Sequence, residues 1–96
     1  MRRVVAAAIG FAWIAAAVAA SAEPPAGAAA CSGCHPASTR VTSPVPRLAG
    51  LDRAAIIRAM QDFRAGTRAA TVMDRIAKGF TDAEIQAIAA WYATQR

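Results

Sequence analysis

Apolar positions in the chain are concentrated in one uninterrupted run near its start and in shorter helical stripes further on. The first run follows Arg2 and Arg3 and ends in the small residues Ala-Ser-Ala at 20–22. A basic start, an apolar middle and a small-x-small end are typical of a secretory signal peptide. The sequence therefore predicts a cleaved leader over 1–22 and a mature domain over 23–96.

An uncleaved membrane anchor is the alternative for the same run. A spanning helix needs about 20 strongly apolar residues, whereas this stretch is short and rich in alanine. The pattern favours cleavage, export to the periplasm, and no membrane attachment of the mature domain.

Beyond the leader, the apolar spacing is helical. A short alanine-rich segment over 26–34 suits a first helix. A second helix is predicted from an N-cap at Asp52 to about Arg64, and Gly66 ends it. Its apolar residues recur at the i, i+3, i+4, i+7 positions of one helix face. They are Ile56, Ala59, Met60 and Phe63.

The C-terminal segment is the most clearly marked helix. Thr81 and Glu84 form a capping-box pattern, in which each side chain accepts from the other residue's backbone amide. Its apolar stripe is Ile85, Ile88, Ala89 and Tyr92. Between the two long helices, a brief helical turn from Met73 is ended by Gly79. No segment shows strand alternation, so the sequence predicts an all-α domain with three main helices.

Composition and charge exclude some partners. The 96-residue chain has a formal charge of +5, of which +3 remains in the predicted mature domain. The basic residues of that domain are scattered, and no aromatic residues alternate with them, so a nucleic-acid partner is not expected. A domain of this size is marginally stable and usually depends on a disulfide, a metal or a cofactor.

The residues Cys31-Ser32-Gly33-Cys34-His35 carry the candidate chemistry. They match C-x-x-C-H, the attachment signature of c-type haem. One helical turn brings both thiols to one side, where they can form thioether bonds with the two porphyrin vinyl groups. The adjacent His35 can then bind the iron as the proximal ligand. Such attachment takes place outside the cytoplasm, which agrees with the predicted leader.

Three other uses of the cysteines fit the sequence less well. A thioredoxin-like dithiol needs a preceding strand in a βαβ unit. A structural zinc site needs four ligands, whereas Cys31, Cys34 and His35 supply three and the chain has no other cysteine or histidine. A disulfide between residues three apart closes too small a loop to stabilise the domain much.

The second axial ligand of the iron is predicted to be a methionine, because His35 is the single histidine. Met60 lies on the apolar stripe of the second helix, which favours a core role. Met73 lies between the second and last helices and is the favoured ligand. Ligation by histidine and methionine raises the reduction potential and leaves no open coordination site, which favours electron transfer over oxygen chemistry.

The chain resembles the class I cytochromes c, and more narrowly the small cytochrome subunit of flavocytochrome c sulfide dehydrogenases and related tandem dihaem cytochromes c. Besides the haem motif, the matching stretches are 46–50, 60–68 and 71–85. The resemblance implies a small class I cytochrome c fold around one covalently bound haem c. It also implies Cys31 and Cys34 as the attachment residues, with His35 and Met73 as the axial ligands.

Further positions take their expected roles from the same resemblance. Pro46 matches the proline whose carbonyl accepts the ring N–H of the proximal histidine, which orients that ring. Leu48 is expected to pack on the haem. Trp91 or Tyr92 is expected to pack the last helix across the first.

Three arginines and one aspartate are charged residues that bear on the predicted haem site. Arg64 and Arg68, or Arg47, could neutralise the two haem propionates, although a solvated surface position is the simpler interpretation of each. Asp74 stands where the family commonly has glycine, beside the expected methionine ligand, and bears on the reduction potential. The family often has two haem domains, whereas this chain has room for one.

The predicted function is single-electron transfer, with no catalysis by the chain itself. The resemblance implies that the electron donor is a flavoprotein subunit that oxidises sulfide. The alternative is a free-standing periplasmic carrier that serves an oxidase or a reductase. An alternative of another class is a ligand-binding haem sensor or a small peroxidase in which Met73 is detached from the iron.

Overall fold

The structure is a computed structural model that describes residues 23–96. The predicted leader over 1–22 lies outside the described residues. The described part contains no strand, and none of its helices is long and apolar enough to cross a membrane. Its helices are α1 Ala28–Cys31, α2 Arg53–Ala65, α3 Met73–Ala77 and α4 Asp82–Thr94. The all-α prediction is confirmed for this part of the chain.

Both long helices begin where the sequence predicts, and α2 ends within a residue of its predicted end. The Asp52 side chain accepts a hydrogen bond from the Ala55 amide at the start of α2, at 3.1 Å. Thr81 and Glu84 form the reciprocal capping box of α4. Gly66 ends α2 with a φ of 76°, in the left-handed region that glycine adopts at little cost.

The first helix is shorter than predicted. α1 is a single turn, and residues 32–34 continue it only as turns, with the His35 amide donating to the Cys31 carbonyl at 2.9 Å. Gly27 precedes α1 with a φ of 87°, and a Cβ atom at this position would lie 2.6 Å from the Phe80 ring. The segment before α1 therefore lies directly against the segment before α4. This close approach requires a glycine at position 27.

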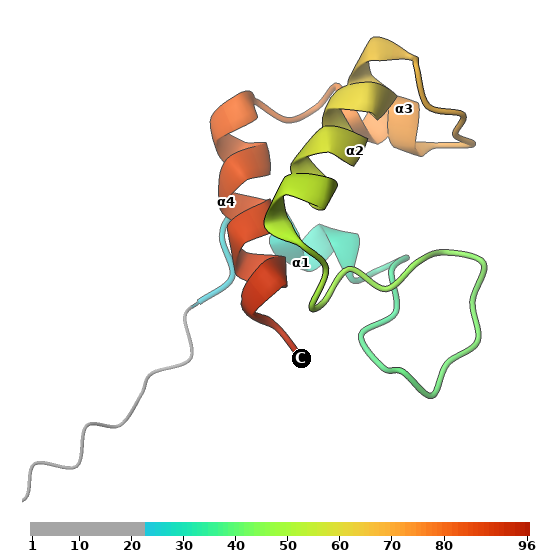
Figure 1. The fold of residues 1–96 in the computed structure, drawn as a ribbon, viewed down its shortest axis with the longest axis vertical. Coiled ribbons are helices and arrows are strands. Elements are labelled where there is room, and N and C mark those ends of the chain that lie inside the picture. Colours follow the sequence, from blue (N-terminus) through green and yellow to red (C-terminus); the bar gives the residue numbers. More distant parts are fainter. Residues whose placement is uncertain (1–22) are drawn as a thin grey trace, which may run out of the picture.

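α2 packs on both α4 and α3, and forms the centre of the domain (Figure 1). α1 and the long loop over 32–52 lie below α2 in this view, and α3 lies beside the upper end of α2. Ala77 of α3 and Ile85 of α4 are buried, and the main cluster of buried residues is small and joins three helices. Its members are Ala28 of α1, Ile56 of α2, and Ile88, Ala89 and Tyr92 of α4.

A charged contact also joins α2 to the start of α4. Arg64 Nη1 lies 2.5 Å from a carboxylate oxygen of Asp82, and Arg64 Nη2 donates to the Phe80 carbonyl at 2.6 Å. The Arg64 side chain is only 31% exposed, so this contact is partly shielded from water. Arg64 thus holds the end of one long helix against the beginning of the other.

Candidate functional site

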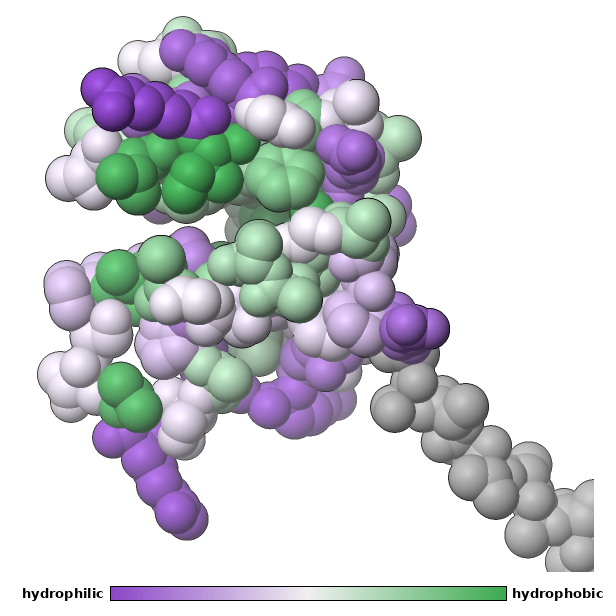
Figure 2. All heavy atoms as spheres, turned by 180° about the vertical axis from the view of Figure 1, so that it is seen from behind, coloured by the Kyte–Doolittle hydropathy of each residue, from purple (hydrophilic) through white to green (hydrophobic). Residues whose placement is uncertain are grey.

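An apolar cleft opens between the part of the molecule formed by α1 and its loop and the part that carries α3 (Figure 2). Its volume is about 970 Å³, near the upper end of the range of roughly 300–1,000 Å³ for small-molecule and cofactor sites. The whole apolar stripe of α2 lines it, as do Ile85 and Ile88 of α4. The stripe that predicts helix packing in the sequence therefore also forms the wall of a ligand-sized space.

The two cysteines and the histidine of the motif all line this cleft. The Cys34 and His35 amides both donate to the Cys31 carbonyl, at 3.2 and 2.9 Å, so the chain turns tightly between the two thiols. Both cysteines are free, with Cys31 half-buried and Cys34 exposed. Burial raises the pKa of the Cys31 thiol, because the thiolate is poorly solvated there.

The imidazole of His35 is oriented by Pro46. Its Nδ1 atom lies 2.5 Å from the Pro46 carbonyl oxygen, and a carbonyl oxygen can only accept a hydrogen bond. Nδ1 therefore carries a proton, and in the neutral imidazole Nε2 has the lone pair that can bind a metal ion. The hydrogen bond that the family resemblance implies for Pro46 is present in the structure.

Two methionines lie on the cleft wall, Met60 and Met73. Met60 of α2 packs against the buried core. Met73 is the first residue of α3 and is half-buried outside that core. Since α3 lies beside the upper end of α2 and α1 lies below α2 in Figure 1, Met73 and the motif line the cleft from different elements on either side of it.

The groups around the cleft fit a planar, largely apolar ligand with a transition metal at its centre. One side offers an imidazole nitrogen and two thiols, the other offers a thioether sulfur, and the remaining walls are mostly apolar. Imidazole and thioether are the donors that hold haem iron in many cytochromes, and thiols are the groups that attach a haem covalently.

The competing uses of the motif lack their structural elements in residues 23–96. No group of three or more His, Cys, Asp or Glu residues in this range is placed to hold a metal ion by itself. No strand in the same range precedes the motif. A zinc site and a thioredoxin-like dithiol therefore fit these residues less well than a porphyrin does.

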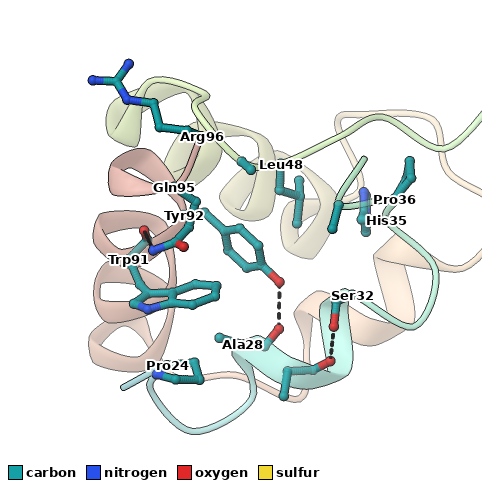
Figure 3. Close-up of a pocket in the computed structure, with 13 residues that line it drawn as sticks. Pro24, Ala28, Ser32, His35, Pro36, Leu48, Trp91, Tyr92, Gln95 and Arg96 are labelled. Atoms are coloured by element: carbon teal, nitrogen blue, oxygen red, sulfur yellow. Dashed lines mark hydrogen bonds between the residues drawn. The ribbon is translucent and has the colours of Figure 1, made fainter. Parts of the chain in front are cut away.

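A smaller hollow of about 280 Å³ lies beside the motif, between α1 and the end of α4 (Figure 3). The hydroxyl of the buried Tyr92 donates to the Ala28 carbonyl at 2.7 Å, which ties α4 to α1. The Trp91 ring meets the Tyr92 ring edge-on, with 4.8 Å between the centroids. Burial raises the pKa of the Tyr92 phenol, and the nearby Cys31 thiol raises it further.

Of the three arginines considered as partners of the haem propionates, only Arg68 lines the cleft. Arg64 is bound at the start of α4, and Arg47 Nε donates to the Ala37 carbonyl at 2.9 Å. Neither side chain lines the cleft. Arg68 does line it, with its guanidinium carbon 5.1 Å from the centre of the Phe63 ring. Other contacts hold the side chains of Arg64 and Arg47 in this structure, and their pairing with the haem propionates stays a prediction.

The burial of Asp74 is a feature that the sequence did not predict. Its Oδ1 atom is buried and has no hydrogen-bond partner among the described residues. Asp74 lies in the first turn of α3, directly after Met73, where the backbone dipoles favour a negative charge. The only signal in the sequence is the departure from glycine at this position.

Comparison with known proteins gives three relatives, all with redox functions in their names. The chain is 40% identical over 62 residues to the cytochrome subunit of sulfide dehydrogenase of Chlorobaculum tepidum. It is 38% identical over 65 residues to cytochrome c-552 of Acidithiobacillus ferridurans. It is also 38% identical over 65 residues to a thiosulfate dehydrogenase electron acceptor of Stutzerimonas stutzeri. No protein-family model matches the chain.

These matches cover 65%, 68% and 66% of this chain, respectively. The chain in turn spans 56% of the first relative, 28% of the second and 30% of the third. The resemblance to the cytochromes c that the motifs predict is confirmed, and the helices of 23–96 agree with an all-α cytochrome fold.

Proposed function

We propose that this chain, a c-type cytochrome by its sequence and its helical fold, transfers single electrons in the periplasm through one covalently bound haem c. The observation that supports this most directly is the convergence of four groups on one apolar cleft. They are the thiols of Cys31 and Cys34, the oriented imidazole of His35, and the thioether of Met73. When bound, the haem supplies an iron that changes between the ferric and ferrous states.

In this proposal each of these side chains has one task. Cys31 and Cys34 hold the haem through thioether bonds, which fixes α1 and the following turn to it. His35 binds the iron through Nε2, and Pro46 keeps its ring from rotating. Met73, the first residue of α3, would hold the iron through its thioether sulfur.

Leu48 and the stripe of α2 keep water away from the metal. Leu48 lines the cleft and packs against the buried core. An apolar environment disfavours the more highly charged ferric state, so these side chains contribute to a raised reduction potential. With His35 and Met73 both holding the iron, oxygen and peroxide would find no free coordination site, and the chain would act as an electron carrier without catalytic groups of its own.

We further propose that the electron donor is a periplasmic dehydrogenase that oxidises a reduced sulfur compound. Two of the three relatives have such activities in their names, sulfide dehydrogenase and thiosulfate dehydrogenase. The flavoprotein subunit of a sulfide dehydrogenase is the donor that the sequence resemblance implies. A stable complex with a flavoprotein after purification from the native source supports a subunit, and a lone monomer supports a free-standing carrier.

The test is expression of the whole chain in a bacterial host that has the cytochrome c attachment machinery. We expect an exported protein whose mass is increased by one haem and which keeps that haem under denaturing conditions. The ferric protein is expected to show the sulfur-to-iron charge-transfer band of histidine and methionine ligation. A colourless exported protein contradicts the proposal.

Met73→Ala and Met60→Ala form a matched pair within this experiment. Met73→Ala is expected to keep the haem, lose the charge-transfer band and bind carbon monoxide when reduced. Met60→Ala is expected to keep the band and to lower the free energy of unfolding by about 2 kcal/mol, because Met60 packs on the core. The reverse outcome assigns the ligand to Met60. Carbon monoxide binding by the unaltered reduced protein supports a sensor or peroxidase instead.

A further inference from the structure

Among the side chains of residues 23–96 that line the cleft, that of Arg68 is the only one with a permanent charge. The other polar groups there are the two thiols, the imidazole of His35 and the hydroxyl of Thr71. Arg68 itself is exposed, so its charge stands at the mouth of the cleft, where water still reaches it. Since a few placed polar groups orient the ligand in a mostly apolar site, this charge indicates the edge at which the ligand carries negative charge.

The guanidinium of Arg68 is held against the cleft wall while its donors stay available. Its contact with the half-buried Phe63 ring, at 5.1 Å, is a cation–π interaction. The Arg68 backbone amide donates to the Asp62 carbonyl at 3.3 Å, which anchors the chain at this point. No acceptor in the described part of the chain takes a hydrogen bond from the Arg68 side chain. Its planar fork can therefore bind a carboxylate through two parallel hydrogen bonds.

The neighbouring arginines of α2 do not offer the same opportunity. Arg53 donates to the Gln86 side chain at 2.9 Å, and Arg64 is bound by Asp82. Arg58 is exposed, and neither it nor the other two lines the cleft. Arg68 differs from these three arginines because it lines the cleft, and its side-chain N–H donors are available to a ligand there.

We propose that Arg68 binds a carboxylate of the haem at the mouth of the cleft, and that this ion pair raises the reduction potential of the protein. The inference rests on the proposed function, because the two propionates of the haem supply the carboxylates. An unpaired carboxylate stabilises the ferric state, which carries one more positive charge than the ferrous state. The guanidinium offsets that stabilisation, so its removal favours the ferric state.

The test compares Arg68→Gln, Arg68→Lys and Arg58→Gln with the unaltered haem-bearing protein by spectroelectrochemical titration at neutral pH and low salt. Arg68→Gln is expected to lower the midpoint potential, so that the ferric-to-ferrous ratio at a fixed solution potential rises about three- to tenfold. Arg68→Lys keeps the charge and is expected to stay within about twofold of the unaltered protein. Arg58→Gln removes an equal charge from α2 outside the cleft and is expected to change the ratio by less than about twofold.

The mass and the absorbance of each variant separate the possible failures. With haem attached throughout, equal ratios for Arg68→Gln and Arg58→Gln overturn the pairing of Arg68 while leaving electron transfer intact. If Arg68→Lys lowers the midpoint potential as much as Arg68→Gln does, the proposed ion pair is also overturned. The positive charge at this position would then have no effect on the potential. An unaltered chain that acquires no haem overturns the inference together with the proposed function.

Discussion

Two side chains of this domain are positioned by single hydrogen bonds to backbone carbonyls. The Pro46 carbonyl orients the imidazole of His35, and the Ala28 carbonyl accepts from the hydroxyl of Tyr92. Sequence resemblance points to Pro46, because a proline at a fixed distance from the motif is recognisable. It named Trp91 or Tyr92 for packing across the first helix, and the structure shows this bond for Tyr92.

Tyr92→Phe tests the bond between α4 and α1. We expect the free energy of unfolding of the haem-bearing protein to fall by about 1–2 kcal/mol at neutral pH, because the Ala28 carbonyl loses its donor in a buried position. Denaturant unfolding followed by circular dichroism measures this loss. Haem content and the charge-transfer band serve as controls and are expected to be unchanged.

The same variant changes the response to alkaline pH. Burial raises the pKa of Tyr92 in the folded state above the value of about 10 in an unfolded chain. Above that pH the unfolded state releases a proton that the folded state retains. The contribution of the protonated Tyr92 phenol to the free energy of unfolding is therefore complete below about pH 10. This contribution is lost as the pH rises through the pKa of Tyr92 in the folded state. Tyr92→Phe is expected to lose less stability than the unaltered protein in this range, and an equal loss in both contradicts the assignment.

The long helices and the short ones differ in how far local sequence defines them. The side-chain caps of Asp52 and Thr81 define where α2 and α4 begin, and Gly66 ends α2 within a residue of the prediction. α1 has no side-chain cap, and the sequence overestimates its length because small alanine-rich segments carry no stop signal. Its end depends on the turn that the motif makes against the rest of the fold.

Thr81→Ala tests the contribution of the capping box to α4. The free energy of unfolding is expected to fall by about 1 kcal/mol, because the Glu84 amide loses the acceptor that lies 3.2 Å away. Thr67→Ala is the matched control, since its hydroxyl makes only long contacts with Asp62, at 3.3 and 3.4 Å. Urea unfolding measures both variants, and equal losses would show that the cap contributes nothing specific.

At the scale of the whole domain, the buried core is small and the apolar cleft is large. No large side chain of residues 23–96 is fully buried, whereas the cleft has a volume of about 970 Å³. Leu51, Val72 and Ile76 line that cleft and remain substantially exposed in the protein alone. A domain of this size gains little from its own core, so a ligand that fills the cleft supplies much of the missing apolar contact.

The double variant Cys31→Ser/Cys34→Ser tests this dependence. Because it cannot hold the haem covalently, we expect it to lack a cooperative thermal transition and to show weak near-ultraviolet circular dichroism. The haem-bearing unaltered protein, measured under the same conditions, is the control. A haem-free chain with a sharp transition, and a stability within about 1 kcal/mol of the control, contradicts the role of the haem as part of the core.

The sequence alone determined the chemistry and the local structure of this protein. The cysteine spacing with the adjacent histidine predicts the cofactor, and the caps and apolar stripes predict the long helices, because these signals act over a few neighbouring residues. Tertiary structure alone decided which side chains meet. It joined Arg64 to Asp82 across the helices, left Arg68 as the charged group at the cleft, and buried a carboxylate oxygen of Asp74. Contacts between residues far apart in the chain depend on how the helices pack, and no local pattern encodes that packing.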